Sequence, residues 1–132
     1  MKTLKTTATA LLIAAGMMMG GNAFALGNDN CKNFDIKVKN HSGYQVKITK
    51  VEYKDYDKNK WRNESLTQKV LQNNVLWTWE RNLEHVDNDN TKLKISYKEK
   101  YGGAFGGYSS TKTAYSSKFV CKDNGARTVT LN

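Results

Sequence analysis

The chain has 132 residues and a formal net charge of +9, from 21 lysine and arginine side chains against 12 aspartate and glutamate side chains. Beyond the amino terminus, no stretch approaches the roughly 20 apolar residues that a membrane-spanning helix needs. The sequence shows no internal repeat and no linker-like shift in composition. These features exclude a polytopic membrane protein and favour one globular domain with a modest core.

The first 25 residues have the form of a secretory signal peptide. Lys2 and Lys5 precede a short apolar run, and small residues occupy the two positions that signal peptidase reads before Ala25. We therefore expect cleavage after Ala25 and a periplasmic or secreted protein, bacterial in the style of its signal. Removing the two signal lysines leaves 19 basic against 12 acidic side chains, a net charge of +7 for residues 26–132.

Two cysteines, Cys31 and Cys121, lie near the two ends of the expected mature domain. In an oxidising compartment, two cysteines most simply form one disulfide. A metal-binding or catalytic thiol is less favoured, because the sequence has no CxxC motif and no patterned histidines. The predicted disulfide closes a loop of about 90 residues, for which chain entropy predicts a stabilisation on the order of 4 kcal/mol.

Two alternating stretches open the domain, and we expect them to form a hairpin. Phe34, Ile36 and Val38 alternate with polar residues, and a second alternating stretch follows the turn at residues 40–43. Its phase slips near Lys50, which predicts a β-bulge there. After a polar loop over residues 54–60, Trp61 is expected to return the chain to the core.

Residues 74–83, NVLWTWERNL, are the stretch around which we expect the domain to be organised. Val75, Trp77 and Trp79 occupy every second position, so on a strand they point to one side. Three large apolar groups on one short strand predict a central strand with its tryptophans in the middle of the core. The alternative, that one tryptophan lines a binding cleft, stays open.

Residues 92–100, KLKISYKEK, have the clearest alternation in the chain. Leu93, Ile95 and Tyr97 share one side, and lysines occupy the other, which predicts a half-buried antiparallel strand with a basic outer face. A glycine-rich loop follows at 101–108, YGGAFGGY. Residues 111–121 regain a β-like composition, and a turn at 123–125 precedes a last strand over 127–131.

This pattern predicts an all-β fold, a small antiparallel β-sandwich of about seven to eight strands with one disulfide. Its general shape is expected to be immunoglobulin-like, although the spacing of its cysteines and tryptophans does not match true immunoglobulin domains. A small closed barrel is the alternative architecture.

Two neighbouring features are the candidate binding site: the basic outer face of the 92–100 strand and the aromatic residues of the 101–108 loop. Lysines raise the local potential and attract anionic partners, whereas mobile loops with aromatic residues supply contact area. The alternatives are a solvated edge that blocks strand pairing and a loop whose aromatics fold back onto the core. The candidate binding residues are Lys92, Lys94, Lys98, Lys100, Tyr101, Phe105 and Tyr108, and Lys37, Lys39, Lys47 and Lys50 are expected to extend the basic stripe.

No motif in the sequence names a reaction. There is no HExxH pair and no GxSxG elbow, so a small hydrolase built on Glu80, Glu84 and His85 is the weakest hypothesis. Asp87 and Asp89 offer oxygen ligands of the kind that calcium prefers, but the run matches no complete calcium loop. We therefore predict no metal and no cofactor, and the calcium alternative stays open.

The leading functional hypothesis is an exported, non-enzymatic binding protein, a class that includes proteins of an inhibitor or immunity type. Its partner is expected to be a protein or an anionic envelope surface. Nucleic acid is the least favoured partner, because its readers usually interleave arginine with exposed aromatics, whereas Tyr97 is expected to face inward. The alternative hypothesis is a secreted membrane-active or lipid-binding protein, which the positive charge and the loop aromatics support.

Overall fold

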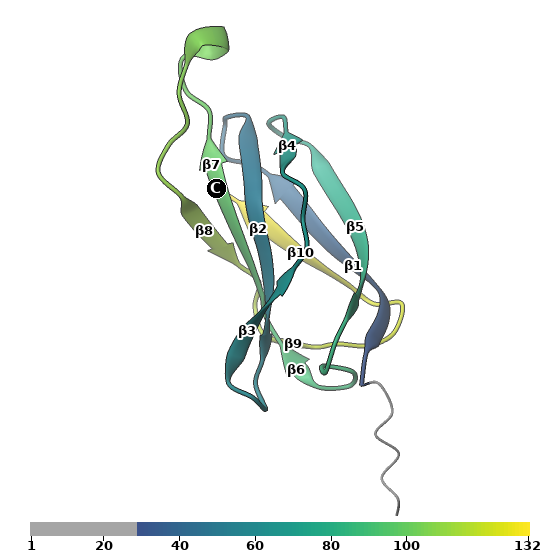
Figure 1. Ribbon diagram of the computed structural model, residues 1–132. Coiled ribbons are helices and arrows are strands. Elements are labelled where there is room, and N and C mark those ends of the chain that lie inside the picture. Colours follow the sequence, from purple (N-terminus) through teal and green to yellow (C-terminus); the bar gives the residue numbers. More distant parts are fainter. Residues whose placement is uncertain (1–28) are drawn as a thin grey trace, which may run out of the picture.

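The computed structural model describes residues 29–132, so the predicted signal peptide over residues 1–25 lies outside the described residues. The regular secondary structure of the described chain is all β-strand, apart from one short 3-10 turn, η1 (Gly103–Phe105) (Figure 1). Among residues 29–132 there is no helix with the length and hydrophobicity of a membrane span. The strands are β1 (Cys31–Asn40), β2 (Val46–Asp55), β3 (Lys60–Glu64), β4 (Lys69–Leu71), β5 (Leu76–Leu83), β6 (Asn90–Thr91), β7 (Leu93–Glu99), β8 (Lys112–Tyr115), β9 (Phe119–Val120) and β10 (Ala126–Leu131).

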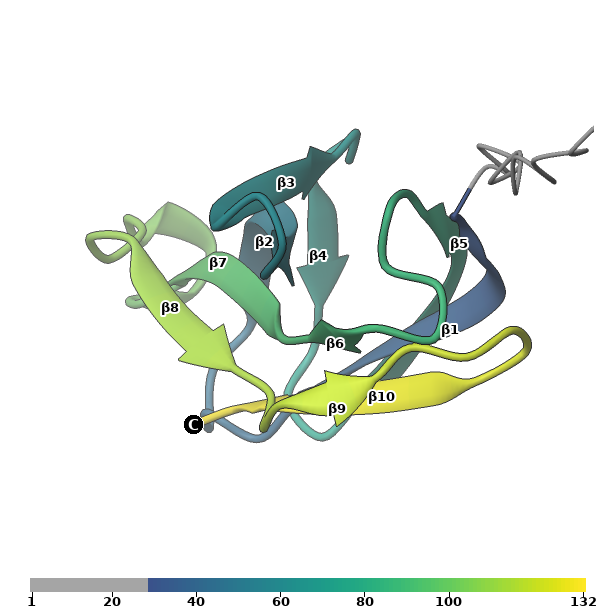
Figure 2. The ribbon, with the colours of Figure 1, turned by 90° about the horizontal axis from the view of Figure 1, so that it is seen from below.

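Two sheets pack face to face, which confirms the predicted small β-sandwich (Figure 2). Sheet A has the strand order β10-β1-β5, and sheet B has the order β3-β2-β7-β8, with β4 pairing beside β3 on the same edge of β2. The short pair β6-β9 lies at one end of the sandwich. All pairings are antiparallel except one: β1 and β10, the first and last strands, run parallel.

The core consists of the inward-facing residues of both sheets, as the alternation in the sequence predicted. Ile36 and Val38 of β1 belong to the same hydrophobic cluster as Leu93 and Ile95 of β7, and all four are fully buried. The register of β2 against β7 shifts between Ile48 and Lys50, which confirms the predicted bulge. Because a bulge inserts one extra residue, Val51 and Tyr53 face inward again after it.

The tryptophan strand is not central, and that prediction was wrong. β5 pairs only with β1, so it is an edge strand of sheet A. Trp77 and Trp79 face the same side as core residues Val38 and Ile36 but stay half-buried, with their rings stacked 5.4 Å apart. Val75 precedes the strand and is exposed. The two tryptophans therefore close the open edge of the sandwich rather than fill its centre.

Cys31 and Cys121 form the predicted disulfide, with their Cα atoms 6.0 Å apart. Both residues are fully buried. Close by, the rings of Phe34 and Phe119 stack at 5.4 Å, and Gly125 packs against the Phe34 ring. A side chain at position 125 would begin only 3.2 Å from that ring, so the close approach explains the glycine.

Candidate binding surface

The predicted basic face exists on the outer side of sheet B, but it is smaller than the sequence indicated. Lys94 and Lys98 of β7 lie beside outward residues of β2, with Lys94 opposite Glu52 and Lys98 opposite Lys47. Lys37 and Lys39 belong to β1 in sheet A and lie on the other side of the sandwich, so the prediction that they extend this stripe was wrong.

Aromatic side chains are interleaved with these lysines. Trp61 of β3 pairs with Lys54, an outward residue of β2, and its ring lies 4.5 Å from the Lys94 Nζ. Tyr115 of β8 pairs with Lys94 and packs its ring 4.7 Å from the Lys92 Nζ. The Trp61 and Tyr115 ring centroids are 6.1 Å apart, although their strands are separated by β2 and β7. The two rings therefore meet across the middle of the face.

Beneath these rings lies an ion-pair cluster. The Glu52 carboxylate forms ion pairs with the Lys94 Nζ at 2.7 Å and with the Lys50 Nζ at 2.8 Å. Glu52 is almost completely buried. Burial opposes ionisation of Glu52, but the hydrogen bonds and charges of the two lysines outweigh it and hold its pKa below the ordinary value of 4.5. Glu52 is thus a carboxylate at neutral pH and neutralises part of the lysine charge.

The prediction that Trp61 returns the chain to the core was wrong. In β3, Arg62 and Glu64 are the residues that face inward, opposite Tyr53 and Val51. Arg62 pairs with Asp55 at 2.7 Å, and Glu64 pairs with Arg81 of β5 at 2.6 Å, so the open edge beside β3 is closed by polar contacts. This arrangement leaves Trp61 on the outer face.

A polar pocket of about 400 Å³ lies between β3 and β5. Its walls include the Tyr53 hydroxyl, which donates to the Glu84 carbonyl and accepts from the Glu84 amide. Burial, with repulsion from Glu64, raises the pKa of Tyr53 to about 12. Of the three residues in the hydrolase hypothesis, Glu84 lines this pocket, whereas Glu80 and His85 are exposed outside it.

The 101–108 loop extends beyond the body of the sandwich between β7 and β8 (Figure 1). Phe105 at its tip is fully exposed, with a relative exposure of 104%. Tyr101 and Tyr108 lie at its base, where they contact different parts of the molecule. Tyr101 packs edge-on against Tyr44 at 4.8 Å, and Tyr108 lies under the Lys47 Nζ at 4.1 Å. The structure thus places Tyr108 near the basic face and Phe105 away from it.

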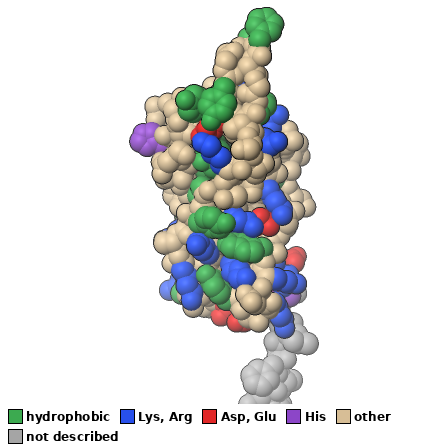
Figure 3. All heavy atoms as spheres, turned by 90° about the vertical axis from the view of Figure 1, so that its left-hand side faces the viewer, with side chains coloured by type: hydrophobic (Ala, Val, Ile, Leu, Met, Phe, Trp, Pro, Cys, Tyr) green, Lys and Arg blue, Asp and Glu red, His purple; other side chains and the backbone are tan. Residues whose placement is uncertain are grey.

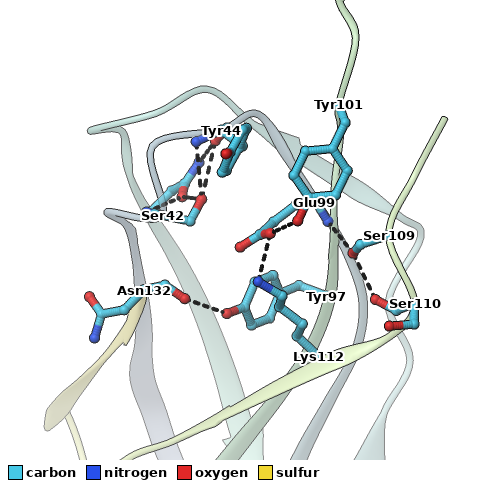
Figure 4. Close-up of polar contacts among 10 residues, drawn as sticks. Ser42, Tyr44, Tyr97, Glu99, Tyr101, Ser109, Ser110, Lys112 and Asn132 are labelled. Carbon is cyan, nitrogen blue, oxygen red and sulfur yellow. Dashed lines mark hydrogen bonds and ion pairs between the residues drawn. The ribbon is translucent and has the colours of Figure 1, made fainter. Parts of the chain in front are cut away.

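The base of the loop is fixed by Glu99, whose side chain points inward at the end of β7 (Figure 4). Glu99 is 2% exposed, accepts hydrogen bonds from the Tyr101 hydroxyl and Lys112, and lies 2.7 Å from the Lys112 Nζ. Burial opposes its ionisation, but these contacts outweigh burial and lower the pKa of Glu99. Ser109 supports the same strand end by donating its amide to the Glu99 carbonyl.

The acidic residues of the 87–90 turn gather at the opposite end of the sandwich. Desolvation and repulsion from Asp57, Asp29, Asp55 and Asp87 raise the pKa of Asp89. Among residues 29–132, the grouping of possible metal ligands is Cys31, Asp87 and Asp123. Its sulfur belongs to the disulfide and is not a thiolate, so this grouping does not make a metal site.

Comparison of the chain with protein-family models, with curated proteins and with solved structures finds no match.

Sequence reasoning identified the lysines of the basic face but missed Trp61 and Tyr115. In both strands a period of two shows which residues share a side, without showing which side is buried. The composition of β3, KWRNE, could have warned that Trp61 need not face the core, because both sides of this strand carry polar residues. The seven predicted binding residues remain predictions, and their positions divide them between the face and the loop.

Proposed function

We propose that this protein is an exported, non-enzymatic binding protein. The outer face of its sheet B would bind an anionic glycan of an envelope surface. The observation that carries this proposal is the interleaving of aromatic rings and lysines on that face. Figure 3 views the molecule from the β8 side, where hydrophobic and basic side chains alternate along its length. The predicted signal peptide supports export.

The chemistry of the face suits a chain of acidic sugars. The ammonium groups of Lys54, Lys92 and Lys94 lie over aromatic rings. Lys94 is paired with Glu52, so Lys54 and Lys92 are the cations that attract carboxylate or sulfate groups. Tyr115 is 50% exposed, so its ring offers a flat apolar surface on which a sugar ring can pack. A lysine-only face would attract the same anions without selecting the sugar.

The length of the face also fits an extended ligand. Above the Trp61–Tyr115 pair, Lys47 covers the Tyr108 ring, and at the other end the Lys118 Nζ lies 4.6 Å from the Tyr56 ring. The aromatic–lysine contacts therefore recur along the molecule rather than cluster in one pocket. An extended polymer can contact several of them at once, which raises the avidity of weak individual contacts.

Calorimetric titration with heparin as an acidic glycan, and with dextran as a neutral one, tests the proposal. We expect binding of heparin alone, and a loss of roughly tenfold in affinity for Trp61→Ala or Tyr115→Ala, the effect of about 1.4 kcal/mol from one aromatic contact. Tyr44→Ala is the matched control, because Tyr44 is a similarly exposed aromatic residue at the loop end, away from the Trp61–Tyr115 pair.

Two outcomes contradict the proposal. If the Trp61→Ala and Tyr115→Ala variants bind heparin as tightly as the wild type, the rings do not contribute and only charge remains. If a single-stranded oligonucleotide binds more tightly than heparin at equal salt, the ligand class is nucleic acid and not glycan, because stacked bases use the same rings.

A further inference from the structure

One end of the sandwich carries basic side chains almost without acidic ones. This basic end consists of the loops 41–45, 72–75 and 100–111, with the strand residues next to them. Among the described residues there, Glu99 is the one acidic side chain, and it is buried against Lys112. Six lysines lie at this end: Lys39, Lys47, Lys69, Lys98, Lys100 and Lys112.

The tip of the basic end has a defined shape that presents Phe105. Gly102 and Gly103 have positive φ angles of 76° and 62°, which other residues adopt only with strain. At Gly106 a Cβ would overlap the carbonyl oxygen of Tyr101, so the closed loop requires glycine there. The Tyr101 amide donates to the Gly107 carbonyl at 3.0 Å, and Lys100 bridges to Tyr108 across the base. The glycines therefore allow the loop to adopt one closed conformation.

Three tyrosines surround the base of this loop. Tyr44, Tyr101 and Tyr108 are each about two-fifths exposed, and each has a polar hydroxyl on an apolar ring. Side chains of this kind favour the boundary between water and lipid, where the ring and the hydroxyl meet different surroundings. The basic end thus combines an apolar residue at the loop tip, three tyrosines at the loop base and lysines on the neighbouring strands.

We propose that the basic end docks on an anionic phospholipid surface, with Phe105 inserted at the boundary of headgroups and acyl chains. Charge complementarity favours this occupant, because the exposed side-chain charges around the loop are positive. A protein pocket would instead be expected to face a rim of mixed charge. This inference shares Lys47 and Tyr108 with the glycan proposal. It depends on the Phe105 tip, whereas the glycan proposal depends on the Trp61–Tyr115 pair.

Sedimentation with lipid vesicles tests the docking directly. Residues 26–132, which contain the whole described fold, are mixed at low salt with vesicles of phosphatidylcholine, or of phosphatidylcholine and phosphatidylglycerol in equal parts. We expect co-sedimentation with the anionic vesicles and not with the neutral ones. Phe105→Ala should lower the bound fraction roughly fivefold, as partial burial of one aromatic ring implies. Phe105→Trp should restore it.

The controls separate insertion from charge and from folding. Phe105 is fully exposed, so circular dichroism of Phe105→Ala should match the wild type. Val120→Ala removes an exposed apolar side chain near the other end and should bind like the wild type. Trp61→Ala should also retain vesicle binding, even if it loses heparin.

Any of four results would overturn the inference. The first three are no sedimentation with anionic vesicles, equal sedimentation with neutral vesicles, and equal binding by Phe105→Ala and the wild type. A loss of vesicle binding in Trp61→Ala without a loss in Phe105→Ala would also overturn it, because the lipid contact would then lie on sheet B.

Discussion

The two ends of the sandwich are stabilised in different ways. The disulfide end, which contains Cys31–Cys121 and the loops 56–59, 84–89 and 116–125, is held by a covalent bond and a stacked pair of phenylalanines. The basic end is held by polar contacts, chiefly those of Glu99 and of the buried Asn40, whose side chain bonds to the Tyr44 and Leu71 carbonyls. A small domain can thus fix one end firmly and leave the other end to present a contact loop.

The strongest test of this difference removes the disulfide. Replacing Cys31 and Cys121 together with serine should lower the free energy of unfolding on the order of 4 kcal/mol, because the unfolded chain regains the freedom of a loop of about 90 residues. Urea denaturation followed by circular dichroism measures the loss. Chemical reduction of the wild type should give the same midpoint, and an unchanged midpoint would show that the disulfide end does not depend on its covalent bond.

The second test acts on the loop of the basic end. Gly106→Ala should lower stability by about 2 kcal/mol, since its Cβ has no space beside the Tyr101 carbonyl and the loop must rebuild. Gly107→Ala is the matched control. No atom lies within 4 Å of its Cβ position, so a change within about 0.5 kcal/mol is expected. Equal denaturation curves for the two variants would mean that the loop has no fixed shape.

The third test changes the buried carboxylate of the basic end. Glu99→Gln should lower stability by about 1–2 kcal/mol at neutral pH, because the charge-assisted contacts with Lys112 and Tyr101 weaken. The pKa of Glu99 is lowered in the folded chain, so its stabilisation is complete above its ordinary value of 4.5 and is lost as the pH falls through the folded value.

A pH series of denaturation curves therefore checks both the size and the sign of the Glu99 effect. The wild type and Glu99→Gln should differ at pH 7 and converge as the pH falls through the lowered pKa of Glu99 in the folded chain. A difference that is constant over the whole series would mean that the ionisation of Glu99 does not stabilise the fold.

The smallest effect is expected at the disulfide end, with the opposite sign. The pKa of Asp89 is raised by desolvation and by its acidic neighbours, so its charge opposes folding above that pKa, and this penalty disappears as the pH falls through it. Asp89 is exposed, and solvent screens the repulsion, so Asp89→Asn should gain only about 0.3 kcal/mol at neutral pH. Thermal melts should show the gain at low salt, whereas a loss of stability would contradict the repulsion.

Local alternation predicted the strands well, and β7 shows why. Leu93, Ile95 and Tyr97 face the core, as the period of two requires. The same period predicts that Glu99 also faces inward. Its buried carboxylate forms an ion pair with Lys112 and accepts a hydrogen bond from the Tyr101 hydroxyl. A regular strand against one apolar layer carries enough local information to specify its own orientation.

Position within a sheet was not predictable in the same way. The Trp77 strand is an edge strand. The predicted hairpin of the first two strands was wrong, because β1 pairs with β5 and β10 and not with β2. Lys37 therefore lies on the sheet opposite to the predicted basic face. Such pairings join distant parts of the chain, and no local pattern encodes them. The exposed position of Trp61 has the same origin, since it depends on which edge of β2 receives β3.

The parallel pairing of β1 with β10 has a consequence for biogenesis. β1 is synthesised early, but it can pair with β10 only after β10 has been synthesised. In the same way, Cys31 can form its disulfide only after Cys121, 90 positions later, has been added. Non-local contacts of this kind delay folding until the chain is nearly complete. Sheet A therefore cannot close on a nascent chain. For the export that we propose, this delay would keep sheet A open while the chain passes through a translocation channel.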